Sequence, residues 1–297
     1  MATYTKPALS VQDQILLLER RGLVIADKVA AANVLTLCNL YRFGGFALHF
    51  WVQPHVRPQQ YQPGTTFEAV VNLMNFDRAL RMLVMDAVEL LEVSVRSSIT
   101  SQASLFYAAP HWYMDSGRFK DWKKHLWFLQ KCLGDFSRSK EVYVQHYKDN
   151  YSDPVLPPSW ILAEISTFGT WSNLYENLSE RKLRNQIAGV FGLDHETFEK
   201  NLHVLSNTRN YCAHHNRIWN RVFSFTPKRK QAKAITLPVT DQRRFAAQAG
   251  MIWIMLRAIE PNSTWTRQLR DLIRQYGIDH RQMGFPANWE QDAFWGI

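Results

Sequence analysis

The chain has 297 residues and a formal net charge of +9, and 46% of its residues are hydrophobic. This composition is too apolar for a disordered protein, while the longest apolar run, residues 246–256, is too short to cross a bilayer. The first residues lack the apolar core of a secretory signal, and the three scattered cysteines (Cys38, Cys132 and Cys212) lack metal or redox spacing, so we expect a cytoplasmic protein.

The hydrophobic pattern predicts helices almost throughout the chain. The predicted helices cover residues 10–22, 27–46, 66–104, 118–138, 161–179, 194–219, 241–259 and 264–277. Ser10, Thr66 and either Asp194 or Thr197 can cap three of them. A break near Asn75 is an alternative within the long helix, and an interruption is expected at Phe168-Gly169. Residues 52–66, 153–160 and 229–240 predict loops, and no run alternates with the period of a strand, so the sequence predicts an all-α fold.

The predicted helix 194–219 carries an unusual polar face. His203, Asn207, Asn210, His214 and Arg217 are spaced four, three, four and three residues apart, which places them on one side of a helix. A face in open water usually collects Lys, Glu and Gln. We therefore expect this stripe to lie in a groove or in a symmetric interface.

The chemistry of this helix resembles what RNA cleavage without a metal requires. A neutral imidazole such as His214 can move a proton, and a guanidinium such as Arg209 can stabilise charge that develops on a phosphate. Asn210 could hold the ring tautomer or the phosphate. The alternatives are a buried polar network that pins helices together, a metal site formed by the histidines, and a Cys212 nucleophile. Cys212 falls on the apolar side of the helix, and no carboxylate stands at helical spacing beside the histidines, so the last two are disfavoured.

A basic stretch follows the polar face directly. Between positions 217 and 244 eight basic residues accompany a single acid, Asp241. Phosphate backbones are the commonest partner of such patches, so we predict RNA contacts here, with a solvated loop as the alternative. The predicted RNA-binding residues are Arg217, Arg221, Lys228, Arg229, Lys230, Lys233, Arg243 and Arg244. A second basic concentration covers residues 267–274.

Three charged residues on the long helix allow two interpretations. Glu89, Glu92 and Arg96 share one face. They could line a groove beside the polar helix or form an intrahelical ladder of salt bridges, and we favour the ladder.

Several blocks of the sequence, in order, resemble the Abi-like proteins (AbiD/AbiF type) of bacterial abortive infection, which belong to the HEPN superfamily. The similar blocks include "KPALSVQDQILLLERRGL", "NLYRFGGFALHF", "STFGTWSNLYENL", "TRNYCAHHNRIWN" and "MGFPANWEQDAFW". The resemblance runs nearly from end to end of the chain.

The resemblance implies a helical bundle of HEPN type with helical insertions and N- and C-terminal helical extensions. The corresponding domains are an N-terminal region (1–62), a HEPN-like core (63–262, with an insert around 108–158) and a C-terminal helix and tail (263–297). The Arg-x-x-x-x-His motif of the superfamily falls on Arg209 and His214, with Asn210 in the polar position after the arginine.

In HEPN ribonucleases two such motifs, commonly from two subunits, form one composite site that uses no metal. The resemblance therefore implies a homodimeric endoribonuclease toxin of phage defence that needs no cofactor and leaves 2′,3′-cyclic phosphate and 5′-hydroxyl ends. His203, Asn207 and His215 would support the site. Some HEPN toxins carry a modifiable tyrosine where this chain has Asn216, so that control is not expected. Some relatives associate with a small noncoding RNA, and the alternative function is a protein that binds RNA without cutting it.

Overall fold

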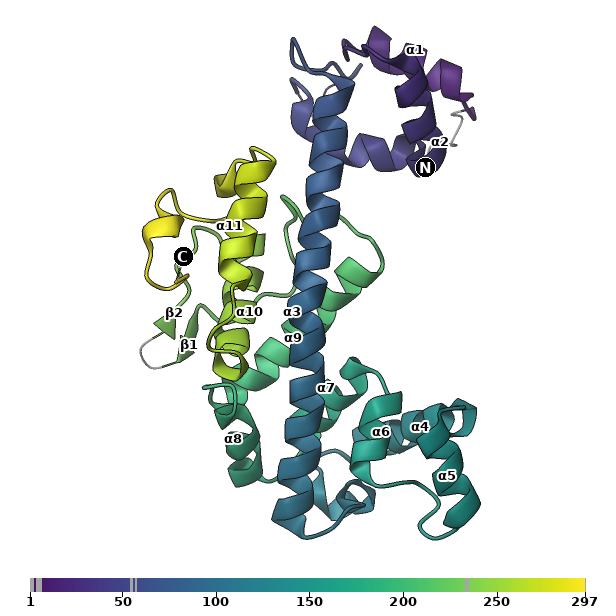
Figure 1. Cartoon of the computed structure of the whole chain (residues 1–297), viewed down its shortest axis with the longest axis vertical. Coiled ribbons are helices and arrows are strands. Elements are labelled where there is room, and N and C mark those ends of the chain that lie inside the picture. Colours follow the sequence, from purple (N-terminus) through teal and green to yellow (C-terminus); the bar gives the residue numbers. More distant parts are fainter. Residues whose placement is uncertain (1–2, 4–6, 54–55, 57, 233–234, 297) are drawn as a thin grey trace. The chain divides into compact units, whose positions relative to one another are not determined.

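The computed structural model of the chain describes residue 3 and residues 7–53, 56, 58–232 and 235–296. It divides into two compact units, and the boundary falls within one long helix. The first unit comprises Met1–Ala79 with Arg274–Ile278, and the second comprises Leu80–Ile273 with Asp279–Ile297. Eleven α-helices and a single two-stranded hairpin make up the regular structure of the described residues apart from short 3-10 turns, which confirms the predicted all-α fold (Figure 1).

The first unit begins with two helices whose starts were readable from the sequence. Helix α1 (Val11–Arg20) is capped by Ser10, whose hydroxyl accepts the Asp13 backbone N–H at 3.1 Å, as predicted. Helix α2 (Lys28–Ala47) is capped by Asp27 and changes direction at Asn39, where φ is 55°. The Asn39 side chain accepts the Arg42 backbone N–H at 2.9 Å and so restarts the helix.

Helix α3 (Phe67–Tyr107) is unbroken, so the alternative break near Asn75 does not occur. Its apolar stripe is buried at three- and four-residue spacing, as the pattern predicts. The buried apolar positions in the second unit are Leu80, Val84, Ala87, Val88, Leu91, Val95, Ile99 and Ala103.

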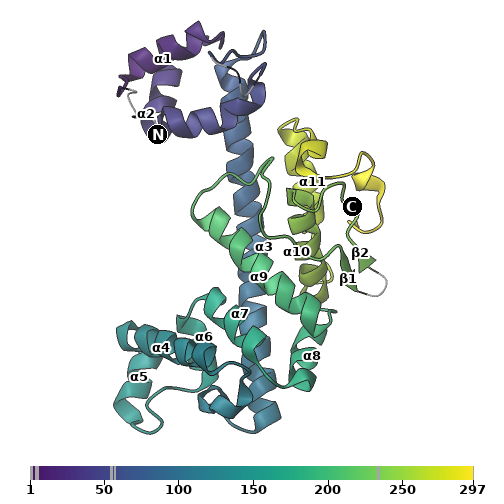
Figure 2. The same cartoon turned by 180° about the vertical axis from the view of Figure 1, so that it is seen from behind.

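The second unit packs its helices around the later part of α3 and around α9 (His195–Ala213), as Figures 1 and 2 show. Helix α7 lies against both α4 and α9, and α8 and α10 also lie against α9. Helix α10 is buried on nearly all sides, and the indole of Trp265 at the start of α11 donates to the Leu83 carbonyl of α3 at 2.9 Å. The bounds are α4 (Trp122–Arg138), α5 (Val142–Asn150), α6 (Ser159–Ile165), α7 (Phe168–Asn177), α8 (Arg181–Gly189), α10 (Phe245–Ile259) and α11 (Trp265–Gln275).

Three expectations about secondary structure were wrong. Helix α9 ends at Ala213, six residues before the predicted end. The predicted loop 229–240 contains an antiparallel hairpin, β1 (Lys230–Ala232) and β2 (Ile235–Thr236), anchored by the fully buried Gln231. The break in the predicted helix 161–179 lies at Ser166-Thr167, because Thr167 accepts the Thr170 backbone N–H and starts a new helix there.

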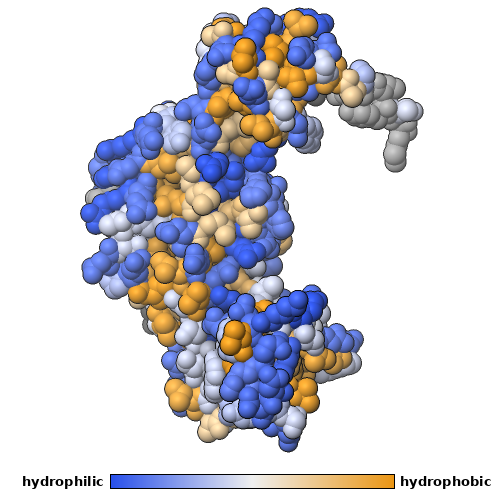
Figure 3. Space-filling model, turned by 45° about the vertical axis from the view of Figure 1, so that its right-hand side comes forward, coloured by the Kyte–Doolittle hydropathy of each residue, from blue (hydrophilic) through white to orange (hydrophobic). Residues whose placement is uncertain are grey.

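The surface mixes polar and apolar side chains. On the face shown in Figure 3, hydrophobic residues form patches between hydrophilic ones. Among the described residues, no helix combines the length and the apolar character needed to cross a membrane.

Candidate functional site

The C-terminal end of α9 is closed by a turn that sets the direction of His214. The His215 backbone N–H donates to the Cys212 carbonyl at 3.0 Å, and the Asn216 N–H donates to the Tyr211 carbonyl at 2.9 Å. This pair of bonds is the Schellman motif, which requires a left-handed residue after the cap, and His215 has φ 57°. His214 is therefore the cap residue of α9.

The early end of α9 corrects the predicted polar face. Arg217 lies outside the helix and does not share a helical face with His203, Asn207 and Asn210. After the turn the chain buries Ile218 and Trp219, whose exposed fractions are 0% and 2%.

Arg209 is held by an acid from another helix. Its Nε lies 3.2 Å from Glu92 Oε1 on α3, and its Nη1 donates to the Asn210 side-chain oxygen at 3.3 Å. The Arg209 side chain is 39% exposed and that of Glu92 only 14%, so the guanidinium keeps an open edge while the carboxylate is nearly enclosed. Arg209 therefore contacts Glu92 on one side and Asn210 on the other.

The Arg209–Glu92 pair lies at a groove along α3, which we call the α3 groove. It has a volume of about 320 Å³. Two basic and three acidic side chains face it, with methionine and valine side chains between them. Its lining residues are Met82, Met85, Asp86, Val88, Glu89, Glu92, Val93, Arg96 and Arg209.

The predicted ladder between Glu89, Glu92 and Arg96 was wrong. Arg96 Nη1 donates to the backbone carbonyls of Ala163 and Ser166, at 3.1 and 3.3 Å, because α3 packs beside the end of α6. Glu92 turns instead to Arg209 of α9. The alternative interpretation, in which the three residues line a groove, agrees with the structure. Periodicity along one helix could not reveal a partner on a second helix.

Enclosure changes the acidity of Glu92. Burial raises the pKa of this carboxyl above its usual range, although the charges of Arg209 and Arg96 oppose the rise. The groove therefore holds a carboxylate that takes up a proton more readily than an exposed glutamate does.

The predicted catalytic histidine stands apart from this groove. His214 is exposed, does not line the α3 groove, and has no hydrogen bond or ion pair from its side chain within the described part of the chain. No interaction among those residues joins it to Arg209. A single chain thus brings together Arg209 and Asn210 but leaves His214 outside the groove.

The predicted supporting residues His203, Asn207 and His215 also lie outside the α3 groove. Asn207 donates to the His203 carbonyl at 2.8 Å, and the His203 ring meets the edge of Phe225 at 4.8 Å between centroids. His215 is exposed and forms the left-handed position of the turn. The polar face of α9 therefore does not line the α3 groove in a single chain. His203, Asn210 and His214 are exposed.

The predicted RNA-binding residues differ in how far they are already occupied. Arg221 stacks over the Tyr211 ring at 3.9 Å, and Lys228 lies 3.5 Å from Glu196. Arg243 and Arg244 both pair with Asp241, at 3.9 and 3.6 Å. Arg229 and Lys230 are exposed and form no ion pair with any described residue. Arg217 is half-buried, and Lys233 lies outside the described residues.

The described residues contain no group of three or more His, Cys, Asp or Glu side chains arranged to hold a metal ion. Cys212 is 3% exposed and packs in the core, as its position on the apolar side of the helix predicts.

The sequence profile of the Abi-like protein family matches residues 33–220. The matched range includes α3, with Glu92, and all of α9, with Arg209, Asn210 and His214. No curated protein and no solved structure matches the chain.

Proposed function

We propose that this chain, which belongs to the Abi-like protein family, is an RNA endonuclease that cuts without a metal ion through Arg209 and His214. Membership of this family supports a role in abortive infection. The observation that carries the proposal is the arrangement at the end of α9. A guanidinium with an open edge stands beside Asn210, and one turn later an imidazole faces solvent without a partner among the described residues.

The proposed reaction is transesterification of the RNA backbone. The 2′-oxygen attacks the adjacent phosphorus, the bond from phosphorus to the 5′-oxygen breaks, and the products carry 2′,3′-cyclic phosphate and 5′-hydroxyl ends. His214 takes the 2′-OH proton or gives a proton to the leaving 5′-oxygen. Arg209 donates to the phosphate oxygens on which negative charge develops, and Asn210 holds the guanidinium edge in place.

The site is proposed to be complete only in a homodimer. In one chain Arg209 is held at the α3 groove, and His214 does not line that groove. A second copy could bring its own His214 to the open edge of Arg209. Met82 and Val93 of the groove are 63% and 53% exposed, which gives such an interface apolar area to bury.

Mixing two inactive variants tests this arrangement. Arg209→Ala and His214→Ala chains should each be inactive alone. If Arg209 of one chain works with His214 of its partner, half of the randomly mixed dimers regain one of two sites, so cleavage should return to about a quarter of the wild-type rate. A mixture that stays inactive while exchanging subunits would contradict the shared site.

Two further measurements test the chemistry. Cleavage should persist in EDTA, and the fragments should resist ligation that requires a 5′-phosphate. Activity that disappears with EDTA and returns with Mg²⁺ or Mn²⁺ would overturn the proposed mechanism.

The second candidate function is RNA binding without cleavage, for example of a small noncoding RNA in the cytoplasm. It is favoured by one observation, namely that Arg209 is already paired with Glu92 in the single chain. A purified chain that carries intact RNA and whose His214→Ala variant behaves like wild type would support it.

A further inference from the structure

A second polar pocket lies at the opposite end of α9 from His214, and we call it the His195 pocket. It has a volume of about 450 Å³, within the range of roughly 300–1,000 Å³ that small-molecule sites occupy. Helix α8, the first turn of α9 and the segment leading into the hairpin form its walls. The lining residues are Arg181, Asn185, Asp194, His195, Glu196, Thr197, Lys228, Lys230, Gln231 and Ala232.

His195 is buried against this pocket without a hydrogen-bond partner for its ring. The residue is 9% exposed, and its Nδ1 is enclosed without a hydrogen-bond partner among the described residues. Burial lowers the pKa of His195, and the charges of Arg184 and Arg181 lower it further, so the ring is neutral at neutral pH. A ring nitrogen that loses its water partner without replacement is costly, and a bound ligand would satisfy Nδ1.

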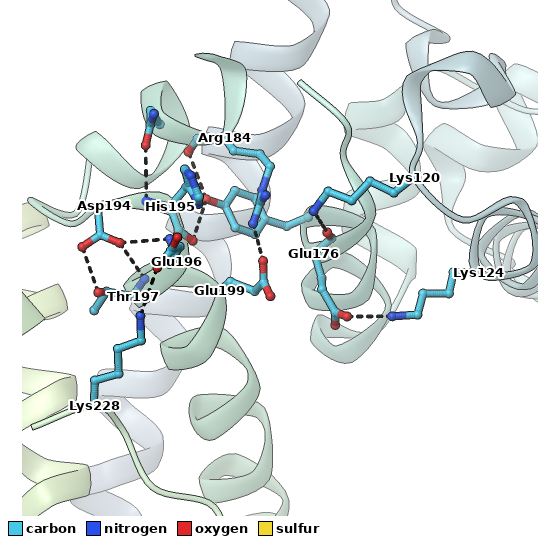
Figure 4. A network of polar contacts seen from close by, with 12 residues as sticks. Lys120, Lys124, Glu176, Arg184, Asp194, His195, Glu196, Thr197, Glu199 and Lys228 are labelled. Carbon is cyan, nitrogen blue, oxygen red and sulfur yellow. Dashed lines mark hydrogen bonds and ion pairs between the residues drawn. The ribbon is translucent and has the colours of Figure 1, made fainter. Parts of the chain in front are cut away.

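The acidic residues of the pocket are already occupied. The carboxylate of Asp194 accepts the backbone N–H groups of Glu196 and Thr197 at 3.0 and 2.9 Å, and the Thr197 hydroxyl at 2.9 Å. Glu196 pairs with Lys228 (Figure 4). The first amides of α9 are therefore used by the cap, and any anion in the pocket must be bound by side chains.

Two cations remain for a ligand. Arg181 at the start of α8 and Lys230 at the start of β1 are exposed, and neither forms an ion pair within the described ranges. They come from different elements that line the same pocket. Gln231 beside Lys230 is fully buried and is fixed by Asn201, whose side-chain amide donates to it at 2.6 Å, so the strand that carries Lys230 is held in place.

We propose that the His195 pocket binds the phosphate of a nucleotide, with Arg181 and Lys230 on the phosphate and with the His195 ring and the Asn185 side-chain NH2 group facing the nucleoside. The Asn185 side-chain oxygen already accepts the His195 backbone N–H at 3.4 Å. Two separate cations suit a phosphate, while neutral donors and acceptors beside them suit a sugar or a base. Inorganic phosphate alone would leave most of the volume and the His195 ring unused. The nucleotide is either free or part of an RNA chain. The proposal does not depend on cleavage at Arg209.

Calorimetry on the full chain can test this pocket. The His214→Ala background prevents any cleavage of the probes, which are inorganic phosphate, adenosine 5′-monophosphate, and one tetraribonucleotide with and without a 5′-phosphate. Arg181→Gln and Lys230→Gln should each weaken nucleotide binding about ten-fold or more, since each removes a charge-assisted hydrogen bond. Lys182→Gln and Lys200→Gln are matched controls, because both lysines are exposed on α8 and α9 and do not line the pocket.

Chemical acetylation of lysines provides a second measurement, made on the chain whose pocket residues are unchanged. Bound nucleotide should protect Lys230 from acetylation and leave Lys182 reactive. The probes identify the source: tight binding of the monophosphate indicates a free nucleotide or an RNA end, whereas binding of both tetranucleotides alike indicates an internal phosphate.

Three results would overturn the proposal that this pocket binds a nucleotide. One is equal affinity for inorganic phosphate and for the nucleotide. The others are binding that Arg181→Gln and Lys230→Gln leave unchanged, and the absence of binding by every probe. A chain that binds the nucleotide here but never cuts RNA would overturn the proposed function and leave this inference intact.

Discussion

The two ends of α9 carry the same kind of side chain in opposite settings. At the start of the helix His195 is buried, has basic neighbours and lines a pocket that a single chain completes. At the end of the helix His214 is exposed and lines no groove with Arg209. The basic groups differ as well, because Arg209 is tied to Glu92 whereas Arg181 and Lys230 have no such partner among the described residues.

This difference separates binding from chemistry. A buried neutral histidine beside two exposed cations can hold a ligand, and its lowered pKa keeps it from carrying a proton at neutral pH. An exposed histidine at a helix cap exchanges protons easily but lacks a second reacting group until another surface approaches. We therefore expect ligand binding at the start of α9 within one chain, and catalysis at its end only in the dimer.

The largest effect should come from His214→Ala. Loss of a general acid or base typically lowers the rate by about 10²–10⁴, and cellular toxicity should fall with it. Because His214 is exposed and its side chain has no described partner, the melting temperature and RNA affinity should change little. His146→Ala, an exposed histidine on α5, is the control. A variant that unfolds or loses its dimer would instead assign His214 a structural role.

Local signals in the sequence predicted one end of α9 and not the other. Asp194 caps the start through its own side chain, within three residues, so the position was readable. The end depends on His215 in a left-handed conformation, a position usually marked by glycine, so the pattern ran on to residue 219. Histidine adopts the left-handed conformation more readily than most residues do, but nothing in the sequence around His215 predicts that it does so here.

Contacts between different helices and strands were the other feature that the sequence could not predict. The predicted stripe on α3 gave most of its buried face, although Leu83 and Met85 are only half-buried. The partner of Glu92 depends on how α3 and α9 pack. The His195 pocket was also missed, because its parts lie in α8, α9 and β1, separated by up to about fifty residues of chain. The sequence signal that points to this pocket is the excess of basic residues around Lys228.

The next largest effect should be on RNA affinity, from the basic residues at positions 228–230. Exchange of Lys228, Arg229 and Lys230 for Glu should weaken the binding of all RNA sequences about equally, since phosphate contacts do not read sequence. The slope of log affinity against log salt should flatten by roughly one unit for each phosphate interaction that the exchange removes. Lys228 is already paired with Glu196, so Lys228→Glu alone should flatten the slope less than Arg229→Glu alone. An unchanged slope would assign these residues to a solvated surface, and equal changes would mean that the pair with Glu196 does not withhold Lys228 from RNA.

A smaller effect should come from Glu92→Gln at the other end. This change frees Arg209 for phosphate, and RNA affinity in the His214→Ala background should rise by no more than about five-fold, because an ion pair with an exposed partner is worth about 0.2–1 kcal/mol. Glu89→Gln removes the same charge one turn away without breaking an ion pair, so it separates the release of Arg209 from a general gain in positive charge. Equal gains in both variants would mean that Glu92 does not restrain Arg209.

The smallest expected effect is a dependence of stability on pH that originates at Glu92. Burial raises the pKa of this carboxyl above its ordinary value of 4.5, against the pull of Arg209 and Arg96, so the folded chain binds a proton more readily than the unfolded chain does. The free energy of unfolding should therefore fall as pH rises from the ordinary value to the raised one, and stay level above it. Melting curves from about pH 4 to about pH 7 should show this fall in the wild type relative to Glu92→Gln.

Arg209→Ala sharpens the same measurement. Arg209 lowers the pKa of Glu92, so its removal should carry the fall in stability to higher pH. A difference between wild type and Glu92→Gln that does not vary with pH would show that the carboxyl is not enclosed as the structure has it. The pair of Glu92 with Arg209 would then be an ordinary solvated ion pair, which restrains the arginine less, and the contrast between the two ends of α9 would rest mainly on the histidines.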